Sequence, residues 1–190
     1  IHKNLSLMKR KKITNTILEA SSHGLKQNRL DGLKFDISIF TNLSRDHLDY
    51  HKTYKDYFNS KLILFKKLTK RGGIIIYDND ISYSKTLKKI CIDKKMKSLT
   101  IGKKDSNLII KKHEYVGNLQ MVEIEFNKKK YSFATSLIGK IQVKNLLFAV
   151  LAASKSKIKF NKIIEFINYI KPVEGRLESI GNIKNNSKVI

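Results

Sequence analysis

Two aspartates and two histidines lie close together in the segment TNLSRDHLDYH. Asp46, His47, Asp49 and His51 could bind a hard cation, or could simply begin the helix expected after them, although a helix cap needs only one such residue. Together with Glu19, at the end of the strand expected before them, they would suit magnesium beside phosphate oxygens better than structural zinc, because the chain has one cysteine. A magnesium site and an ordinary polar loop both remain possible interpretations of this pattern.

A lysine lies on the apolar side of the helix that follows. Spacings of three and four residues place seven side chains on one helical face: Tyr54, Tyr57, Phe58, Lys61, Leu62, Phe65 and Leu68. A lysine in such a place usually packs its aliphatic stem and extends its amine to water. A buried amine is more readily neutral, however, and a neutral amine can react with carbonyl compounds or carbon dioxide, so Lys61 is a candidate for lysine chemistry.

The elements that would position these residues alternate along the chain. The pattern predicts a buried strand at 13–20 that runs into a turn and helix start, a strand at 34–40, a helix at 53–68, a strand at 72–80 and a helix at 82–96. This order predicts an α/β fold with a mostly parallel sheet and flanking helices, and ligands beyond the carboxyl ends of the strands.

The second half of the chain has a different pattern. Short strands between about 99 and 138 predict a small antiparallel β insertion, with the lysine-rich stretch at 127–130 as a hairpin turn. Helices are expected at 143–158 and 161–170, and Pro172 ends the second of them.

The composition describes a globular chain. With 190 residues, of which 41% are apolar, it can bury a core and is expected to form one domain, or one domain and a piece. No run of about 18 apolar residues predicts a membrane span, and the N-terminus lacks the apolar block of a signal peptide. We expect a cytoplasmic protein that does not bind membranes, with Cys91 as a thiol in the core.

The positive charge suggests a nucleic-acid binder, but its distribution does not. The chain has 39 Lys plus Arg against 16 Asp plus Glu, a net charge of +23. The lysines are spread along the whole chain, whereas a binding surface should cluster them, and no aromatic RNA-binding motif or helix-turn-helix pattern accompanies them. We therefore expect no nucleic-acid partner, although anionic substrates such as nucleotides fit the basic balance.

Several separate motifs resemble those of one family. The stretches EASSHGLKQNR, FTNLSRDHLDYH, SKLILF, GKIQVKNLLFAVLAA and PVEGRLE occur in the order and spacing seen in the Mur ligases. The resemblance is to the type that adds the third amino acid of the peptidoglycan stem peptide. It implies a P-loop NTPase-like central ATP-binding domain and a cytoplasmic, ATP-dependent carbon–nitrogen ligase of bacterial cell-wall synthesis, working as a monomer.

The reaction implied by this resemblance joins two amino acids through an activated carboxylate. ATP would transfer its γ-phosphoryl group to the D-glutamyl carboxylate of UDP-MurNAc-L-Ala-D-Glu, and a diamino acid, meso-diaminopimelate or L-lysine, would attack the acyl phosphate. Metal ions and precise positioning are what phosphoryl transfer requires.

The resemblance also assigns a metal site. Lys61 matches the family's carbamylated lysine, an N6-carboxylysine whose new carboxylate helps to hold Mg²⁺. Glu19 and His47 match the other metal-linked positions, and His47 also counts among the catalytic residues. An amine cannot bind a cation, whereas its carbamate can.

Substrate positions follow from the same motifs. Ser21, Gln27 and Arg29 match residues that contact the UDP-MurNAc-dipeptide, and Asn145 and Arg176 match positions near the nucleotide. For Asn145 the alternative is a polar side chain that faces solvent on a helix. For Arg176 it is a surface ion pair with a neighbouring glutamate. His23 is expected to be structural, and His51 to begin a helix rather than bind a ligand.

The chain also departs from the family pattern. It has no GxxGKT-like phosphate loop before Glu19. We expect residues 1–172 to form the central domain, truncated at its N-terminal side, and 173–190 to begin the C-terminal domain, so that the piece alone lacks activity. Two alternatives remain: a ligase that joins glutamates to folate on a similar fold, and a basic nucleic-acid-binding module.

Overall fold

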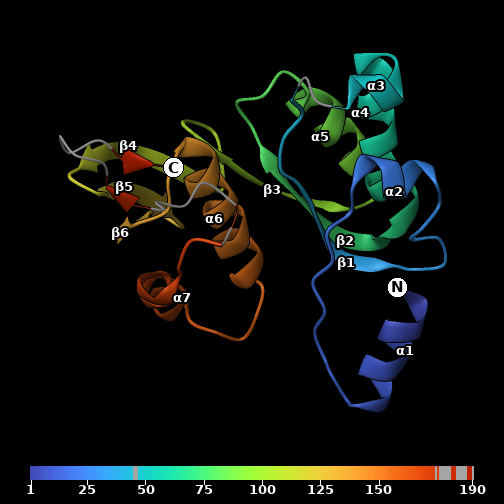
Figure 1. Ribbon diagram of the computed structural model, residues 1–190, viewed down its shortest axis with the longest axis horizontal. Coiled ribbons are helices and arrows are strands. Elements are labelled where there is room, and N and C mark those ends of the chain that lie inside the picture. The colour runs from blue at the N-terminus through green and yellow to red at the C-terminus, as the bar shows by residue number, and fades with distance from the viewer. Residues whose placement is uncertain (45–46, 174, 176–180, 183–187, 190) are drawn as a thin grey trace. The chain divides into compact units, whose positions relative to one another are not determined.

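The computed structural model describes residues 1–44, 47–173, 175, 181–182 and 188–189 (Figure 1). Its helices are α1 (His2–Arg10), α2 (Ser22–Lys26), α3 (Leu48–His51), α4 (Tyr54–Ile63), α5 (Ser84–Asp93), α6 (Lys140–Ala153) and α7 (Phe160–Phe166), with a π-helical turn at Leu64–Leu68 and a 3₁₀ turn at Ile167–Tyr169. Its strands are β1 (Phe35–Phe40), β2 (Thr69–Asp78), β3 (Lys97–Gly102), β4 (Leu108–Val116), β5 (Leu119–Phe126), β6 (Lys129–Thr135), β7 (Gly181–Asn182) and β8 (Lys188–Val189).

Six of these strands form one mixed sheet in the order β1-β2-β3-β4-β5-β6. Helical segments join β1 to β2 and β2 to β3, which is the kind of connection that parallel neighbours require. β3 pairs with β4 in parallel, whereas β4, β5 and β6 pair antiparallel through short turns. The predicted α/β class, with a mostly parallel sheet, flanking helices and an antiparallel addition, is confirmed, and the antiparallel strands extend the same sheet.

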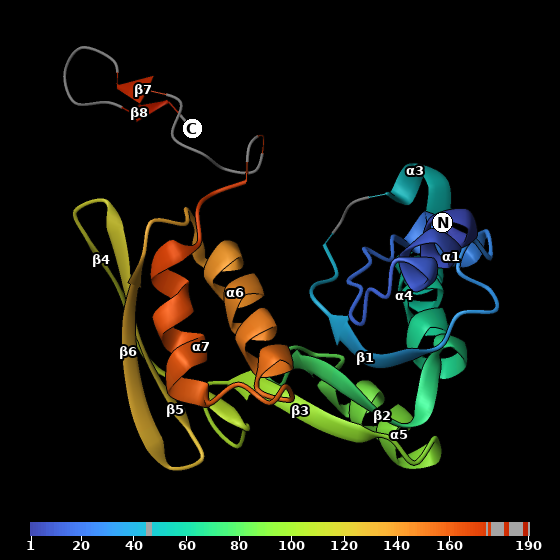
Figure 2. The same ribbon diagram turned by 90° about the horizontal axis from the view of Figure 1, so that it is seen from below.

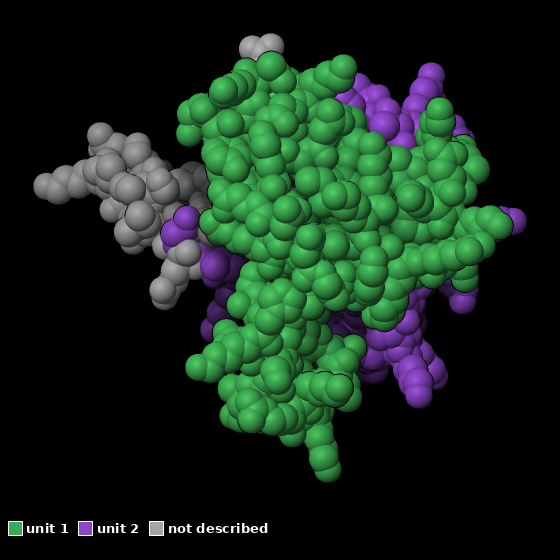
Figure 3. All heavy atoms as spheres, turned by 90° about the vertical axis from the view of Figure 1, so that its right-hand side faces the viewer, with its two compact units in different colours: residues 1–38, 42–75, 88–97 green, residues 39–41, 76–87, 98–190 purple. Residues whose placement is uncertain are grey.

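The chain divides into two compact units, coloured separately in Figure 3. Unit 1 comprises residues 1–38, 42–75 and 88–97, and unit 2 comprises 39–41, 76–87 and 98–190. Six of the candidate site residues lie in unit 1, and Asn145 lies in unit 2.

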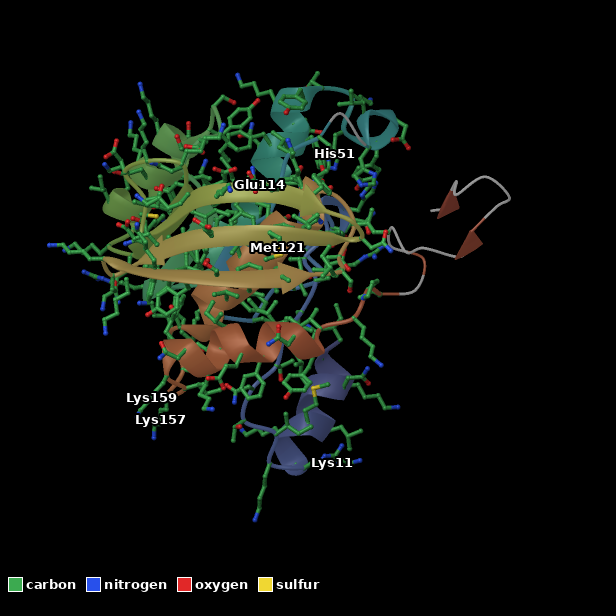
Figure 4. The ribbon with its side chains drawn as sticks, turned by 90° about the vertical axis from the view of Figure 1, so that its left-hand side faces the viewer. Lys11, His51, Glu114, Met121, Lys157 and Lys159 are labelled. Carbon is green, nitrogen blue, oxygen red and sulfur yellow. The ribbon has the colours of Figure 1, made fainter. Side chains whose placement is uncertain are left out.

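Unit 2 is built on the antiparallel strands and two helices. In Figure 2, α6 and α7 lie side by side against one face of β4–β6. Helix α6 is apolar on most of its circumference and buries six side chains: Val143, Leu146, Leu147, Phe148, Val150 and Leu151. Glu114 and Met121 are cross-strand partners on β4 and β5, and both are exposed (Figure 4). The sheet therefore has one covered and one open face here, as antiparallel sheets commonly do.

The predicted strand at 13–20 is wrong. These residues have no regular secondary structure, and Ile13 and Ile17 are 49% and 97% exposed. A strand is stable only when its backbone pairs with a neighbour, and among the described residues β1 pairs with β2 alone. Apolar, β-branched residues gave this stretch a strand-like pattern, but no ladder partner makes it a strand.

Three further features bear on the sequence expectations. Helix α1 was not expected from the sequence, and it buries no side chain. The turn between β5 and β6 is at Asn127 and Lys128, both with positive φ, so the predicted hairpin turn is confirmed. Cys91 on α5 is buried, and burial raises the pKa of its thiol to about 11, as expected of a core cysteine.

Candidate functional site

Helix α4 presents the lysine as the sequence predicts. It begins after Thr53, whose hydroxyl oxygen accepts a hydrogen bond from the Asp56 N–H at 3.1 Å. The expected apolar face is confirmed, with Tyr57, Leu62 and Phe65 all at most 3% exposed. Lys61 is half-buried on this face, and its Nζ lies 5.1 Å from the centre of the Tyr57 ring. This distance allows a cation–π contact while the amine is protonated.

Helix α4 continues into a π-helical turn instead of ending in a loop. After Ile63 the chain continues as a π-helical turn, Leu64–Leu68, that leads directly into β2. Such turns are uncommon and occur frequently at functional sites. Here the turn lies immediately beyond Lys61, at the point where the helix joins the sheet.

His47 lies beside the same tyrosine. It precedes α3 with the left-handed backbone conformation φ 60°, and its side chain is exposed. Its ring meets the edge of the Tyr57 ring with 5.9 Å between centres. Tyr57 therefore contacts both His47 and Lys61, so two of the three predicted metal positions adjoin one aromatic ring.

The predicted substrate residues flank α2, with Ser21 before it and Gln27 and Arg29 after it. Ser21 caps this helix, and its hydroxyl oxygen accepts a hydrogen bond from the Gly24 N–H at 3.1 Å. Gln27 donates from Nε2 to the Tyr50 hydroxyl at 3.2 Å. Ser21, Gln27 and Arg29 are all exposed, which leaves them accessible to a ligand.

A set of aromatic and imidazole rings in contact with one another joins these residues to the lysine helix. We call it the ring cluster: His23, His47, Tyr50, His51 and Tyr57. The His23 ring lies 4.1 Å from Tyr50 and 4.9 Å from His47, between ring centres. A continuous series of contacts thus runs from Gln27 through the ring cluster to Lys61, all within unit 1.

The ring cluster brings three histidines together, which the sequence did not suggest. His23 lies 5.3 Å from His51, between ring centres, as well as beside His47. Among the described residues, however, no group of three His, Cys, Asp or Glu side chains is arranged to hold a metal ion. The structural role of His23 stays a prediction, and its ring contacts with His47 and His51 are what the structure adds.

The predicted metal ligands fit magnesium only under one chemical condition. Glu19 is exposed and supplies a carboxylate, but it lies in the irregular segment 13–20 rather than at the end of a strand. Lys61 as an amine offers no oxygen, and His47 offers one nitrogen. Because Mg²⁺ prefers oxygen ligands, this set suits it when Lys61 carries a carbamate.

His51 differs most from its expected place. It ends α3 instead of beginning a helix, and it is completely buried. Its Nε2 lies 2.9 Å from Ser22 Oγ on α2, and its Nδ1 lies 3.4 Å from Ser60 Oγ on α4. A buried imidazole needs partners for both nitrogens, and only the folded arrangement reveals that two serines supply them.

The hydrogen bonds around His51 identify its tautomer. Ser60 donates its hydroxyl proton to the Asp56 carbonyl oxygen at 2.8 Å, so towards His51 it can only accept. Nδ1 must then carry the hydrogen and Nε2 must accept from Ser22. Burial lowers the pKa of His51, an effect that the nearby Asp56 carboxylate opposes, so the neutral imidazole is favoured.

The two predicted nucleotide residues are placed differently. Asn145 is exposed on α6, which is compatible with both of its interpretations. Arg176 lies outside the described residues. A feature that the sequence reading missed adjoins Asn145: Lys144 donates from Nζ to Asp78 Oδ2 at 2.5 Å, and the Asp78 side chain is 3% exposed. The helix residue beside Asn145 is therefore tied to the end of β2.

Comparison with known proteins is decisive at this point. The family model described as the Mur ligase middle domain matches residues 1–153. The chain belongs to the Mur ligase family. A solved structure titled as a UDP-N-acetylmuramoyl-L-alanyl-D-glutamate--2,6-diaminopimelate ligase superposes with a TM-score of 0.76 at 27% identity, and the match covers 87% of this chain and 34% of that one.

Curated Mur ligases of the same name are similar in sequence. The relative from Chelativorans sp. (strain BNC1) is 35% identical over 189 residues, which is 100% of this chain and 39% of the relative. The relative from Rickettsia montanensis is 39% identical over 166 residues, 87% of this chain and 34% of the relative. The chain thus spans between a third and two fifths of the length of these relatives.

The folate-related alternative is supported only at the level of fold. The apo form of L. casei FPGS superposes with a TM-score of 0.61 at 18% identity, covering 77% of this chain and 36% of that one. Such an identity indicates a common architecture, whereas the Mur ligase relatives resemble this chain in sequence as well. The Mur ligase interpretation is therefore favoured.

No described helix of this Mur ligase chain is long and apolar enough to cross a membrane.

Proposed function

We propose that this chain is part of an ATP-dependent ligase that adds a diamino acid, 2,6-diaminopimelate in the named relatives, to UDP-MurNAc-L-Ala-D-Glu. The observation that carries the proposal is the series of contacts from the α2 substrate positions to Lys61 and His47 in a chain of the Mur ligase family. Residues 1–172 would be the central domain and 173–190 the beginning of the next one.

The acceptor would bind at the α2 side of this series. Ser21, Gln27 and Arg29 are accessible there, and the Arg29 guanidinium can bind a carboxylate or phosphate through paired donors. Gln27 would exchange or share its hydrogen bond with Tyr50 when the acceptor binds. These residues orient the D-glutamyl carboxylate for phosphorylation.

Residues at the Lys61 end of this series of contacts would bind the metal ion and lie near the phosphates. Carbamylated Lys61, Glu19 and His47 would hold Mg²⁺, which neutralises phosphate charge when it is bound. Lys61 is half-buried beside Tyr57, and its amine must lose a proton before it can react with carbon dioxide, because only a neutral amine is nucleophilic. Asn145 and Arg176 would contact the nucleotide. The protein would act in the cytoplasm, as a monomer and without a nucleic-acid partner.

Replacement of Lys61 tests this function in the whole protein. With ATP, Mg²⁺, bicarbonate, UDP-MurNAc-L-Ala-D-Glu and diaminopimelate, Lys61→Ala should lower kcat by about 10²-fold or more, the scale for loss of a group that stabilises transition-state charge. Added formate or acetate should partly restore activity, and the intact mass of the wild type should show the carbamate.

A matched control is available on the same helical segment. Lys66 is exposed two residues beyond Leu64, so Lys66→Ala should retain activity. An active Lys61→Ala protein with an unmodified wild-type lysine would refute the carbamate role. A wild type that phosphorylates no acceptor, with either diaminopimelate or lysine supplied, would refute the ligase itself, and glutamate transfer to folate in the same assay would favour the alternative.

A further inference from the structure

His51 is a fully buried polar residue at the meeting point of three helices. It ends α3, bonds to Ser22 on α2 at 2.9 Å, and approaches Ser60 on α4 at 3.4 Å. Both serines are 3% exposed, so water does not compete for these hydrogen bonds. Polar contacts shielded in this way fix geometry more strictly than surface contacts do.

The two serines are neighbours of the proposed reacting groups. Ser22 follows Ser21, the first of the substrate positions, and Ser60 precedes Lys61 in sequence. A direct polar connection between the acceptor side and the metal side of the site therefore passes through one imidazole.

The imidazole itself is held in one orientation. Its ring stacks on Tyr57 with 5.0 Å between centres and an interplanar angle of 26°, and it meets Tyr50 edge-on at 4.9 Å. The stacked Tyr57 ring and the edge contact with Tyr50 oppose a ring flip, so Nε2 stays directed at α2 and Nδ1 at α4.

We propose that His51 is a positioning residue of the ligase: its imidazole sets helix α2, with the acceptor-binding residues, in register with helix α4, with Lys61. This inference rests on the proposed function. Acyl phosphate formation needs the acceptor carboxylate and the metal-bound phosphate in contact, and an error of about 1 Å in such a placement can cost about 10²-fold in rate.

Ser22, His51 and the nearby Asp56 do not form a hydrolytic triad. The Ser22 hydroxyl is buried, and His51 Nδ1 is 3.6 Å from Asp56 Oδ2, whose carboxylate already pairs with Lys26 at 2.5 Å. A substrate could not reach Ser22. The arrangement therefore suits a structural connection between helices, and not a nucleophile with its base.

Two substitutions of His51 distinguish its contact with Ser22 from its contact with Ser60. His51→Gln places an amide oxygen near the Nε2 position and can accept from Ser22, whereas His51→Asn places an amide near the Nδ1 position and keeps only the α4 contact. The Lys26–Asp56 ion pair also joins α2 to α4, but both of its side chains are more than a third exposed. Because α3 is joined to α4 by two residues of chain, the buried contact of His51 with Ser22, and not its contact with Ser60, is the one that positions α2.

The experiment measures steady-state kinetics of the whole protein. His51→Ala should lower kcat by about 10²-fold with little change in KM for ATP, His51→Gln should recover most of the rate, and His51→Asn should recover little. Ser22→Ala should resemble His51→Asn. His113→Ala is the matched control, because His113 is a partly buried histidine of unit 2 bonded to Gln120 at 2.7 Å.

Equal loss in His51→Gln and His51→Asn, or a loss matched by His113→Ala, would overturn the proposal, since either result would indicate general destabilisation. A wild type without ligase activity would instead refute the proposed function. In that case the acetylation rate of Lys61 relative to Lys66, read by mass spectrometry, still tests the connection: it should change several-fold in His51→Ala and return in His51→Gln. An unchanged ratio would overturn it.

Discussion

Individual side chains of unit 1 serve two purposes at once. His51 and Tyr57 are buried and belong to the packing of three helices, yet they also contact His47, Lys61 or their sequence neighbours. We therefore expect substitutions in this region to change both stability and the proposed activity, so unfolding and kinetics must be measured separately.

The buried imidazole should make stability depend on pH. Burial lowers the pKa of His51 in the fold below its ordinary value of 6.5, so the unfolded chain binds this proton more readily than the folded chain. The contribution of neutral His51 to the free energy of unfolding is therefore fully present above about pH 6.5. It decreases as the pH falls from there towards the pKa of His51 in the folded chain. Urea midpoints at about pH 7.5 and about pH 5.5 should differ more for the wild type than for His51→Gln.

The carboxylate nearest to His51 does not contribute in this pH window. The pKa of Asp56 is lowered from 3.8, chiefly by its hydrogen bond with Lys26, so its contribution is lost only at much lower pH. An identical midpoint shift in the wild type and in His51→Gln would contradict the prediction.

The ion pair between Lys144 and Asp78 should contribute more to stability than exposed ion pairs of similar length do. Asp78 is buried at the end of β2, so Lys144→Met leaves a carboxylate with little access to water. We expect a loss of about 1–3 kcal/mol in the free energy of unfolding, less than for a fully buried pair because the Lys144 side chain is 41% exposed.

Lys162 provides the comparison for this pair. It bonds to Glu165 at 2.6 Å on α7, but both side chains are more than half exposed, so Lys162→Met should cost about 0–1 kcal/mol. Equal costs for the two substitutions, measured by urea unfolding, would mean that burial of Asp78 has no energetic consequence.

At the scale of whole elements, the segment 13–20 tests whether an apolar pattern alone is enough to predict a buried strand. Ile17→Ser should change the unfolding free energy by no more than about 0.5 kcal/mol, because the side chain is 97% exposed. Ile76→Ser in β2 should cost more than about 3 kcal/mol, since that side chain is fully buried. A large cost at Ile17 would show that the segment packs as a strand after all.

The elements that the sequence predicted correctly share one property. β1, β2 and the lysine face of α4 have periodic apolar residues and find partners within the described chain. Residues 13–20 have a similar pattern without a partner, and α1 forms with no buried side chain at all. Periodicity reports which face of an element could be buried, and only the tertiary arrangement determines whether it is.

In the candidate site, too, the sequence predicted some residues, whereas the contacts between them are visible only in the structure. Motif positions identified Lys61, His47 and the α2 residues, and the structure connects these through ring contacts that no sequence spacing specifies. His51, Ser22 and Ser60 could not be found in advance, because a buried hydrogen bond between residues 29 positions apart leaves no local signal.

At the scale of the whole molecule, the net charge of +23 makes a distinct prediction. The lysines belong to many elements, among them α1, the turn at 127–128 and the segment between α6 and α7 that carries Lys157 and Lys159 (Figure 4). A dispersed charge binds polyanions non-specifically through counterion release, and this binding is weak at physiological salt, with dissociation constants of about 10⁻⁴–10⁻⁶ M. Fluorescence titration with duplex DNA should give no dissociation constant below about 10⁻⁶ M, and tighter binding there would revive the binding-module alternative.

The buried thiol of α5 offers a way to watch the folded chain move. Cys91 is the one cysteine of the sequence, and both its burial and its raised pKa keep the reactive thiolate scarce while the fold is closed. A thiol reagent can therefore modify the chain only during transient openings that expose α5, and the rate of modification measures how often they occur. Cys91 is therefore a natural probe of local unfolding at α5, and its modification rate can be measured without an engineered label.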